Sequence, residues 1–132
     1  MVLPLRWVAG AGGEGGGDVV VMVSRLEVKR LRDVLPFLRD SLRIRRQAAA
    51  APGGLGHALA AAPLRRTFWT QSVWADRAAV ETFAAARPHR DIVRGSRPRM
   101  ADSRFVFLVR PASEVRQGLP WDKVREMTAG QG

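Results

Sequence analysis

Four stretches of the chain have the apolar, β-branched pattern of strands. Residues 18–28, DVVVMVSRLEV, are rich in valine, and residues 67–74, TFWTQSVW, combine β-branched with aromatic side chains. In residues 103–110, SRFVFLVR, aromatic and aliphatic side chains alternate. Residues 55–63, LGHALAAAP, have a weaker pattern that is typical of an edge strand. The patterns predict four strands, of which the second and third along the chain form a hairpin.

Two longer stretches have the 3.6-residue period of amphipathic helices. The first follows Asp33, which can serve as its N-cap, and keeps one apolar stripe until APGG at 51–54 ends it. The second begins after Asp76, is interrupted by Pro88, and restarts with that proline in its first turn. Residues 120–127, PWDKVREM, are a short amphipathic candidate near the C-terminus.

The order of these elements is β-α-β-β-α-β, which is the split pattern of ferredoxin-like folds. We therefore expect an α+β fold in which two helices cover one face of a four-stranded antiparallel sheet. Residues 1–17 include the glycine-rich run AGAGGEGGG and are expected to be disordered. Residues 18–111 are expected to form the folded domain, and residues 112–132 a tail with a short helix.

The predicted strands are apolar on both faces, although an antiparallel sheet usually leaves its second face polar. In residues 67–74, Trp69 points to one face and Trp74 to the other. The sequence alone does not say which face of residues 18–28 meets the helices; if Ser24 marks the pocket, Met22 and Ser24 face the helices and Val21 points the opposite way. We expect a second copy of the chain to cover the remaining face. The result would be a homodimer packed sheet against sheet, which Val21→Asp should break.

Composition indicates an ordinary globular protein. The chain has 132 residues, 46% of them hydrophobic and 26% charged, and it has no cysteine, so disulfides and thiolate chemistry are excluded. No apolar run is long enough to span a membrane, and the N-terminus lacks the uninterrupted apolar core of a signal peptide. We therefore expect no membrane partner and a cytoplasmic location.

The formal charge of +10 raises the question of nucleic-acid binding. The basic residues are mostly arginines spread along the chain, and the densest group, Arg39, Arg43 and Arg46, forms one stripe of a helix. The G-x-G-x-x-G spacing that begins at Gly10 precedes a strand instead of following one, so a dinucleotide site is not expected. An RNA-recognition domain is also not expected, because residues 18–28 have no aromatic side chain for base stacking. Nucleic-acid binding through the arginine stripe remains the weakest alternative.

Three segments together resemble the antibiotic-biosynthesis monooxygenase family, which includes the haem-degrading monooxygenases. They are SRLEV at 24–28, TFWTQSVWADRAAVETF at 67–83, and RPHRDIV at 87–93 with its histidine. The resemblance covers roughly residues 18–110. It implies a dimeric α+β barrel with a pocket between helices and sheet in each subunit. It also implies oxygen chemistry on a flat aromatic or porphyrin-like substrate, often with no metal or flavin.

The resemblance also implies candidate site residues. The haem-degrading branch has an asparagine where this chain has Ser24, a tryptophan where it has Phe83, and the haem-ligating histidine where it has His89. Quinol-oxidising relatives use a tyrosine, which this chain lacks. The implied cofactor is none, or haem. The candidates are Ser24 and His89 for catalysis and Met22, Trp69, Trp74 and Phe83 for substrate binding, with at most one of the two tryptophans at a given pocket.

The surroundings of His89 allow a physical expectation of its charge. It follows Pro88 at the start of the restarted helix, where the helix dipole and the neighbouring arginines oppose a positive imidazole, while Asp91 favours one. We expect a neutral ring that can accept a proton or bind iron. The alternative role is hydrogen bonding at a helix break. His57 has no second ligand at metal-binding spacing, so a zinc site is not expected.

These observations predict a small cytoplasmic monooxygenase-like homodimer that acts on a flat apolar substrate. The main alternative is a dimer on the same scaffold that binds a hydrophobic ligand or haem without turnover. The two differ in one test, because His89→Ala should abolish turnover if the protein is an oxygenase.

Overall fold

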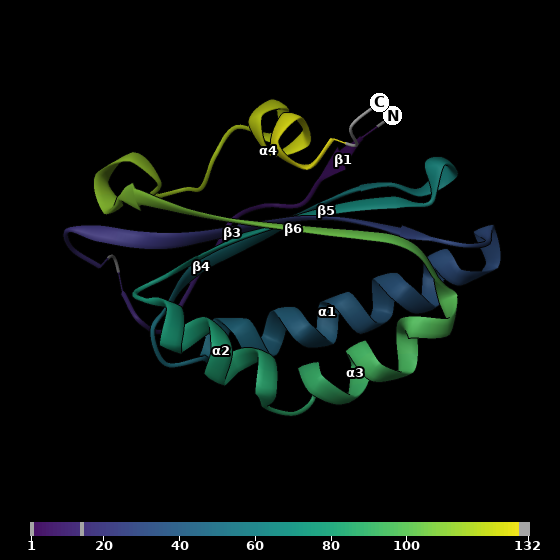
Figure 1. Ribbon diagram of the computed structural model, residues 1–132, viewed down its shortest axis with the longest axis horizontal. Helices are drawn as coiled ribbons and strands as arrows, with labels where there is room; N and C mark the ends of the chain where they lie inside the picture. Colours follow the sequence, from purple (N-terminus) through teal and green to yellow (C-terminus); the bar gives the residue numbers. More distant parts are fainter. Residues whose placement is uncertain (1, 14, 130–132) are drawn as a thin grey trace.

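A single antiparallel sheet lies at the centre of the molecule, with helices on both of its faces (Figure 1). The computed structural model describes residues 2–13 and 15–129. The strands are β1 (Leu3–Pro4), β2 (Val8–Ala9), β3 (Asp18–Val28), β4 (Gly54–Ala62), β5 (Thr67–Trp74) and β6 (Met100–Pro111). The helices are α1 (Val34–Ala50), α2 (Arg77–Ala85), α3 (His89–Ser96) and α4 (Trp121–Thr128), and short 3₁₀ turns join several of these elements.

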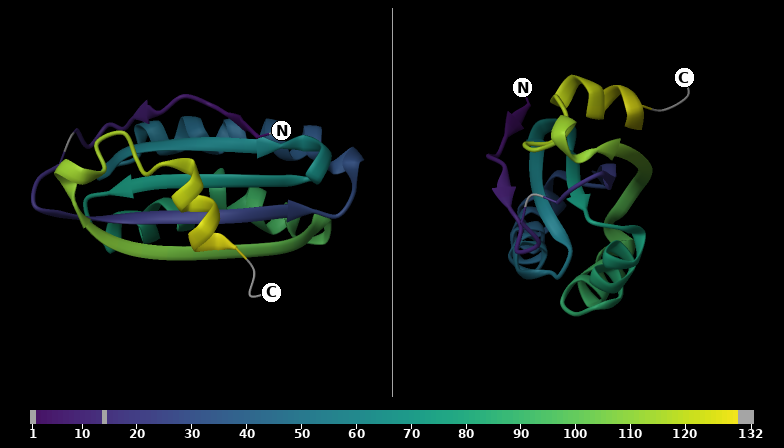
Figure 2. Two further views of the ribbon diagram at one scale, coloured as in Figure 1. Left: turned by 90° about the horizontal axis from the view of Figure 1, so that it is seen from above. Right: turned by 90° about the vertical axis from the view of Figure 1, so that its left-hand side faces the viewer.

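The four long strands have the order β4-β5-β3-β6, which is the predicted ferredoxin-like arrangement. Every pairing between neighbours is antiparallel. The sheet is larger than predicted, because β1 and β2 both pair with the outer side of β4 and bring the number of strands to six. The view from above in Figure 2 shows this order, with the N-terminal segment along one edge and β6 along the other.

Two short N-terminal segments, Leu3–Pro4 and Val8–Ala9, belong to the sheet, although residues 1–17 were predicted to be disordered. Val8 lies opposite His57 in the β2–β4 pairing. Trp7 packs over Gly56, where any side chain would collide with its ring. As a result β4 is buried along its whole length and is not the edge strand that its weak pattern predicted. The backbone of the N-terminal segment supplies the pairing that an edge strand would lack.

Three helices, α1, α2 and α3, cover one face of the sheet (Figure 1). The carboxylate of Asp76 caps α2 by accepting a hydrogen bond from the backbone N–H of Ala79 at 2.8 Å. Asp33 does not cap α1 in the predicted way, because its carboxylate accepts from the backbone N–H of Arg30 instead. None of the helices in residues 2–13 and 15–129 combines the length and hydropathy of a transmembrane span.

The opposite face of the sheet is covered by the C-terminal tail of the same chain. α4 lies across this face (Figures 1 and 2), where Val124, Val21 and Trp69 belong to one buried cluster. The side chain of Gln71 fixes the tail to the sheet through Leu119. Its Nε2 donates to the carbonyl of Leu119 at 3.0 Å, and its Oε1 accepts from the N–H of Leu119 at 2.7 Å. The prediction that a second copy covers Val21 is therefore corrected, since Val21 is 0% exposed in the single chain.

One apolar strip stays exposed at the free edge of the sheet. Phe105, Phe107 and Val109 point to the helix-covered side of β6, yet they are 56%, 37% and 60% exposed. The guanidinium group of Arg77 on α2 lies 3.7 Å from the centroid of the Phe107 ring. Through this contact α2 covers part of the strip. The helices thus leave the outermost strand largely open.

Candidate functional site

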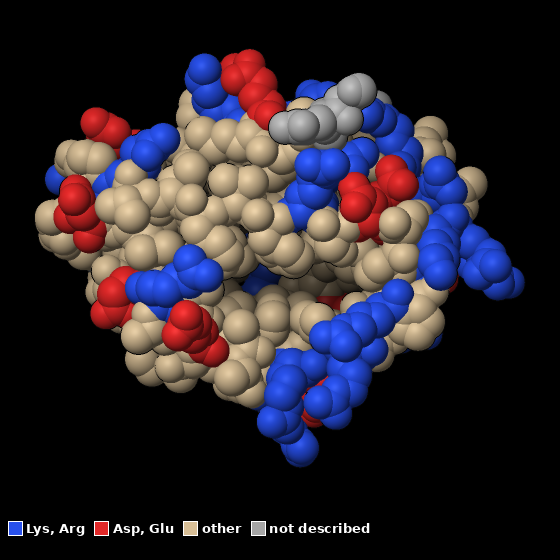
Figure 3. Space-filling view, in the orientation of Figure 1, with Lys and Arg blue, Asp and Glu red and all other residues tan. Residues whose placement is uncertain are grey.

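A cavity of about 380 Å³ lies between the sheet and the helices α1, α2 and α3. Figure 3 shows its opening as a hollow between β6 and the helices α2 and α3, with a basic side chain visible at the back. Apolar side chains such as Leu26, Phe37 and Ile44 make up much of its lining. Its volume is in the range of sites that hold small organic molecules.

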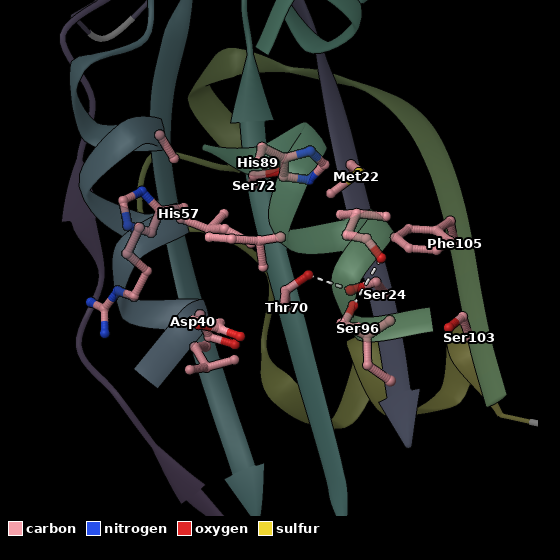
Figure 4. A pocket seen from close by; sticks show the side chains of 18 of the residues that line it. Met22, Ser24, Asp40, His57, Thr70, Ser72, His89, Ser96, Ser103 and Phe105 are labelled. Atoms are coloured by element: carbon pink, nitrogen blue, oxygen red, sulfur yellow. Dashed lines mark hydrogen bonds between the residues drawn. The ribbon is translucent and has the colours of Figure 1, made fainter. Parts of the chain in front are cut away.

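The cavity crosses the sheet from the β6 edge to β4. From one side to the other it is lined by Phe105 on β6, Ser24 on β3, Thr70 on β5 and His57 on β4 (Figure 4). Since neighbouring strands lie about 4.8 Å apart, the floor is about 14 Å across. A floor of this width can accommodate a flat molecule of two or three fused rings.

Hydroxyl groups form a polar strip in the floor of the cavity. The hydroxyl groups of Ser24 and Thr70, which are directly opposite in the β3–β5 pairing, are hydrogen-bonded to each other. Ser72 accepts a hydrogen bond from the indole N–H of Trp74 at 2.8 Å. Ser24 is completely buried, whereas Thr70 is partly exposed. Thr70 is therefore the hydroxyl of this pair that a bound molecule reaches.

His89 is held beside the cavity by contacts with α1 and α2. Its backbone N–H donates to Oε1 of Gln47 at 2.8 Å, and Nε2 of Gln47 donates to the carbonyl of Phe83 at 3.1 Å. The imidazole packs on Phe83 with ring centroids 4.9 Å apart, and its Nδ1 lies 3.1 Å from the carbonyl oxygen of Ala84. Nδ1 must carry the proton to donate to this carbonyl. In the neutral ring, Nε2 is then left as an acceptor.

The pKa of His89 is shifted in the predicted direction, toward the neutral ring, but for a partly different reason. Burial lowers the pKa of His89, and the hydrogen bond to Ala84 opposes this with a smaller effect. Asp91, which was expected to favour the charged ring, is instead paired with Arg87 at 3.2 Å and with Arg90 at 3.7 Å. Burial is thus the main reason why the neutral form of the imidazole is favoured.

His57 had no expected role, yet it lines the cavity at the β4 side. The residue is 6% exposed, and its Nε2 is buried without a hydrogen-bond partner among the described residues. Burial, together with the positive charge of Arg45, lowers the pKa of His57 to about 4. The signal available in the sequence was a lone imidazole in an apolar strand. In the structure its position opposite Ser72 puts it on the helix-covered face.

Most of the predicted site residues come together at this cavity. Trp69 does not: it lies on the other face of the sheet, with the guanidinium group of Arg125 at 5.3 Å from its ring centroid. Trp74 is thus the tryptophan at the cavity, and it packs against Phe83 with ring centroids 4.9 Å apart. The predicted residues that line the cavity are Met22, Ser24, Trp74, Phe83 and His89.

The described part of the chain has no cluster of three or more His, Asp or Glu side chains that could hold a metal ion. Asp40 is a carboxylate on the cavity wall, and it lies 3.8 Å from Arg39 and 3.9 Å from Arg43. The cavity therefore offers imidazole nitrogens and hydroxyl groups for proton transfer and hydrogen bonding.

Comparison with known proteins gives matches in structure only. No family model matches the chain, and no curated protein matches it in sequence. SnoaB, a cofactor-independent oxygenase from Streptomyces nogalater, is 19% identical over 69% of this chain and 91% of its own, with a TM-score of 0.56. PA3566 from Pseudomonas aeruginosa is 16% identical over 70% and 93% of the two chains, with a TM-score of 0.64. An antibiotic biosynthesis monooxygenase is 19% identical over 67% and 95%, with a TM-score of 0.58.

These matches confirm the predicted resemblance to the antibiotic-biosynthesis monooxygenases at the level of the fold. Each covers about two thirds of this chain and nearly all of the other protein. At such low identity the shared fold does not assign an activity, so function has to be argued from the cavity and its residues.

Proposed function

We propose that this chain, which has the fold of antibiotic-biosynthesis monooxygenases, is an oxygenase that acts on a flat aromatic substrate without a bound cofactor. The observation that carries the proposal is the apolar cavity in which a neutral His89 keeps Nε2 as an acceptor. It is supported by SnoaB, a cofactor-independent oxygenase of the same fold.

The reaction requires a substrate with an acidic methylene group, for example one conjugated to a carbonyl across an aromatic ring. Nε2 of His89 removes a proton from this carbon, and the resulting carbanion transfers electrons to O₂. A carbon–oxygen bond forms, the peroxide takes up a proton, and the hydroperoxide loses water to leave a carbonyl. One methylene and one O₂ thus give one carbonyl and one water, so all the electrons come from the substrate and no external reductant is needed.

The other lining residues position the substrate and exclude water. Trp74 and Phe83 provide flat apolar walls, and Met22 provides a flexible one. Thr70 is placed to hydrogen-bond a substrate oxygen, while Ser24 orients the Thr70 hydroxyl from behind. The apolar walls limit the access of water and so protect the carbanion from protonation by solvent.

Binding of haem without turnover is the second candidate function. Its supporting observation is again His89, because an unprotonated Nε2 is the atom that binds haem iron. In this candidate function His89 would hold the iron, and the apolar walls would contact the porphyrin face. When bound, haem would supply iron-centred oxygen chemistry, while the residues of this chain would hold and enclose it.

A homodimer is also part of the proposal, with β6 as the contact. The free edge of β6 can pair with the same strand of a second copy in antiparallel register centred on Val106. That register places Asp102 of one copy opposite Arg110 of the other, and Phe105 opposite Phe107. The strip of exposed apolar side chains on β6 would then be continuous across the contact.

The proposed activity is tested with anthrone, a tricyclic compound whose methylene is acidified by the carbonyl across its central ring. We expect the protein to accelerate oxygen uptake and the formation of anthraquinone, with one O₂ consumed for each product. His89→Gln should lower the rate at least a hundredfold, in line with the loss of a general base. Trp69→Phe, on the other face of the sheet, should keep the rate.

Haemin titration separates the two candidate functions. A saturable shift of the visible haem band that is lost in His89→Gln, without oxygen uptake from anthrone, would support haem binding. An anthrone rate no greater than that without protein, or an unchanged rate in His89→Gln, would contradict the oxygenase proposal.

A further inference from the structure

His57 and Arg45 share the end of the cavity that lies farthest from the opening beside β6. His57 is on β4 and Phe105 is on β6. These are the two outer strands in the row of four long strands, so the two residues lie on opposite sides of the cavity floor (Figure 4). Arg45 is on α1 and lines the same cavity. The inner end is thus polar and basic, whereas the walls leading to it are mostly apolar.

The side chains of His57 and Arg45 both have polar groups whose interactions are incomplete, and this lowers the stability of the fold. Nε2 of His57 is buried with no hydrogen-bond partner in residues 2–13 and 15–129, and a buried polar atom without a hydrogen bond is destabilising. Arg45 has no ion pair with a carboxylate among the described residues, and one of its terminal nitrogens donates to the carbonyl of Arg6 at 3.2 Å. A partly buried guanidinium without a counter-charge is also unfavourable.

We propose that this inner end recognises an acidic oxygen group of the substrate, a carboxylate or a phenolate on a flat aromatic ring. The proposal rests on the proposed function, because it concerns the same cavity. The acidic group of the ligand accepts a hydrogen bond from the guanidinium group of Arg45. It also accepts one from His57, in the tautomer that carries the proton on Nε2. Both unfavourable features would be removed by one ligand group.

The other charged groups at the cavity do not cancel this preference. Asp40 is one turn and a half before Arg45 on α1, and its carboxylate lies between two arginines, at 3.8 Å from Arg39 and 3.9 Å from Arg43. Arg97, after α3, is a second basic residue on the lining. The field inside the cavity therefore favours an anion over a cation.

The geometry also orients the substrate. With its acidic group at His57 and Arg45, a molecule of two or three fused rings extends across β5 and β3 toward β6. Its rings then pass the hydroxyl of Thr70 and the side chain of Trp74, both of which lie on β5. The acidic group acts as an anchor and takes no part in the reaction.

The test compares two ligands of the same shape, 2-naphthoate and 2-naphthamide, which differ in charge. Binding to the full chain is measured by calorimetry at neutral pH, with circular dichroism to show that each variant is folded. We expect the protein to bind 2-naphthoate at least tenfold more tightly than 2-naphthamide. Arg45→Met and His57→Phe should each reduce this ratio to threefold or less, with little change in the affinity for 2-naphthamide.

Arg46→Met is the matched control, because Arg46 is the next residue of α1, is exposed, and does not line the cavity. It should keep the ratio of the unmodified protein. Equal binding of both ligands would overturn the acidic-group proposal and leave the aromatic cavity intact. A preference for 2-naphthoate that persists in Arg45→Met and His57→Phe would also overturn it. Failure to bind either ligand would count against the proposed function itself, and against this inference with it.

Discussion

The hydroxyl groups of Ser24 and Thr70 are hydrogen-bonded across neighbouring strands, and Thr70 is the partly exposed one. The sequence had suggested Ser24 as the group that contacts substrate, but Ser24 is completely buried. Under the proposed function, Thr70→Val should therefore lower kcat/KM about tenfold, which corresponds to one hydrogen bond. Ser24→Ala should have a smaller effect, because it leaves the Thr70 hydroxyl in place. The measurement is steady-state oxidation of anthrone.

Thr70→Ser is the control for this comparison, since it keeps the hydroxyl and removes only a methyl group. It should retain most of the activity. If Ser24→Ala lowers kcat/KM more than Thr70→Val does, the assignment of Thr70 as the substrate contact is incorrect.

The low pKa of His57 predicts a specific dependence of stability on pH. The free imidazole takes up a proton near pH 6.5, whereas His57 in the folded protein does so near pH 4. As the pH falls from about 6.5 to about 4, the unfolded state binds the proton first, so the folded state loses stability, by about 3 kcal/mol at the lower end. Above pH 6.5 His57 contributes no pH dependence. Urea unfolding at a series of pH values measures this change.

His57→Leu should flatten the stability curve between pH 6.5 and pH 4, whatever its effect on stability at neutral pH. The matched variant is His89→Leu, since burial also lowers the pKa of His89 but a hydrogen bond to Ala84 opposes the shift. This variant should keep the larger part of the slope. Identical slopes in the unmodified protein and His57→Leu would show that His57 is not held neutral by the fold.

The long strands could be predicted from sequence because their signal is local. The segments TFWTQSVW and DVVVMVSRLEV coincide with β5 and β3 residue for residue, since β-branched and aromatic side chains need no knowledge of their partners. The division of Trp69 and Trp74 between two faces was also predictable, because side chains alternate along any strand. The cavity residues on β3 and β5 follow from this alternation.

The remaining features depend on contacts between distant segments. Pairing of the N-terminal residues with β4 uses backbone hydrogen bonds, which leave little trace in side-chain pattern. The amphipathic pattern of residues 120–127 predicts a helix with one apolar face, but the attachment through backbone groups of Leu119 that places it on this sheet leaves no mark in the sequence. The role of His57 depends on a register shift at Gly54 and Gly56 and on the nearby charge of Arg45, and neither can be read from the sequence around it.

The proposed dimer contact predicts that an acidic substitution on β6 gives monomers. Phe107 is exposed and packs under the guanidinium group of Arg77, so Phe107→Asp exchanges a ring contact for an ion pair and should leave the monomer folded. In the register centred on Val106, the new carboxylate would face the apolar ring of Phe105 in the second copy, where its burial is unfavourable. Light scattering should then give the monomer mass for this variant and the dimer mass for the unmodified protein.

Leu64→Asp is the control for Phe107→Asp. Leu64 is also an exposed apolar residue, but it lies in the turn between β4 and β5, away from β6. This variant should keep the dimer mass. A dimer that survives Phe107→Asp would place the contact elsewhere, and a monomeric unmodified protein would dismiss the dimer.

Because the tail is attached to Gln71, removal of the side-chain amide of this residue should strongly lower stability. Gln71 is buried, and its side chain is bonded to both the N–H and the carbonyl of Leu119. Gln71→Leu would leave two backbone groups without partners, and we expect it to lower the free energy of unfolding by about 2–4 kcal/mol. Gln117→Leu, the same exchange at an exposed position of the tail, should change it by less than about 0.5 kcal/mol.

Because α4 covers Trp69, loosening of the tail should also shift the tryptophan fluorescence to longer wavelength in Gln71→Leu before global unfolding. Equal stability of the two variants would mean that burial of Val124 and its neighbours holds α4 on the sheet without help from this hydrogen-bonded pair.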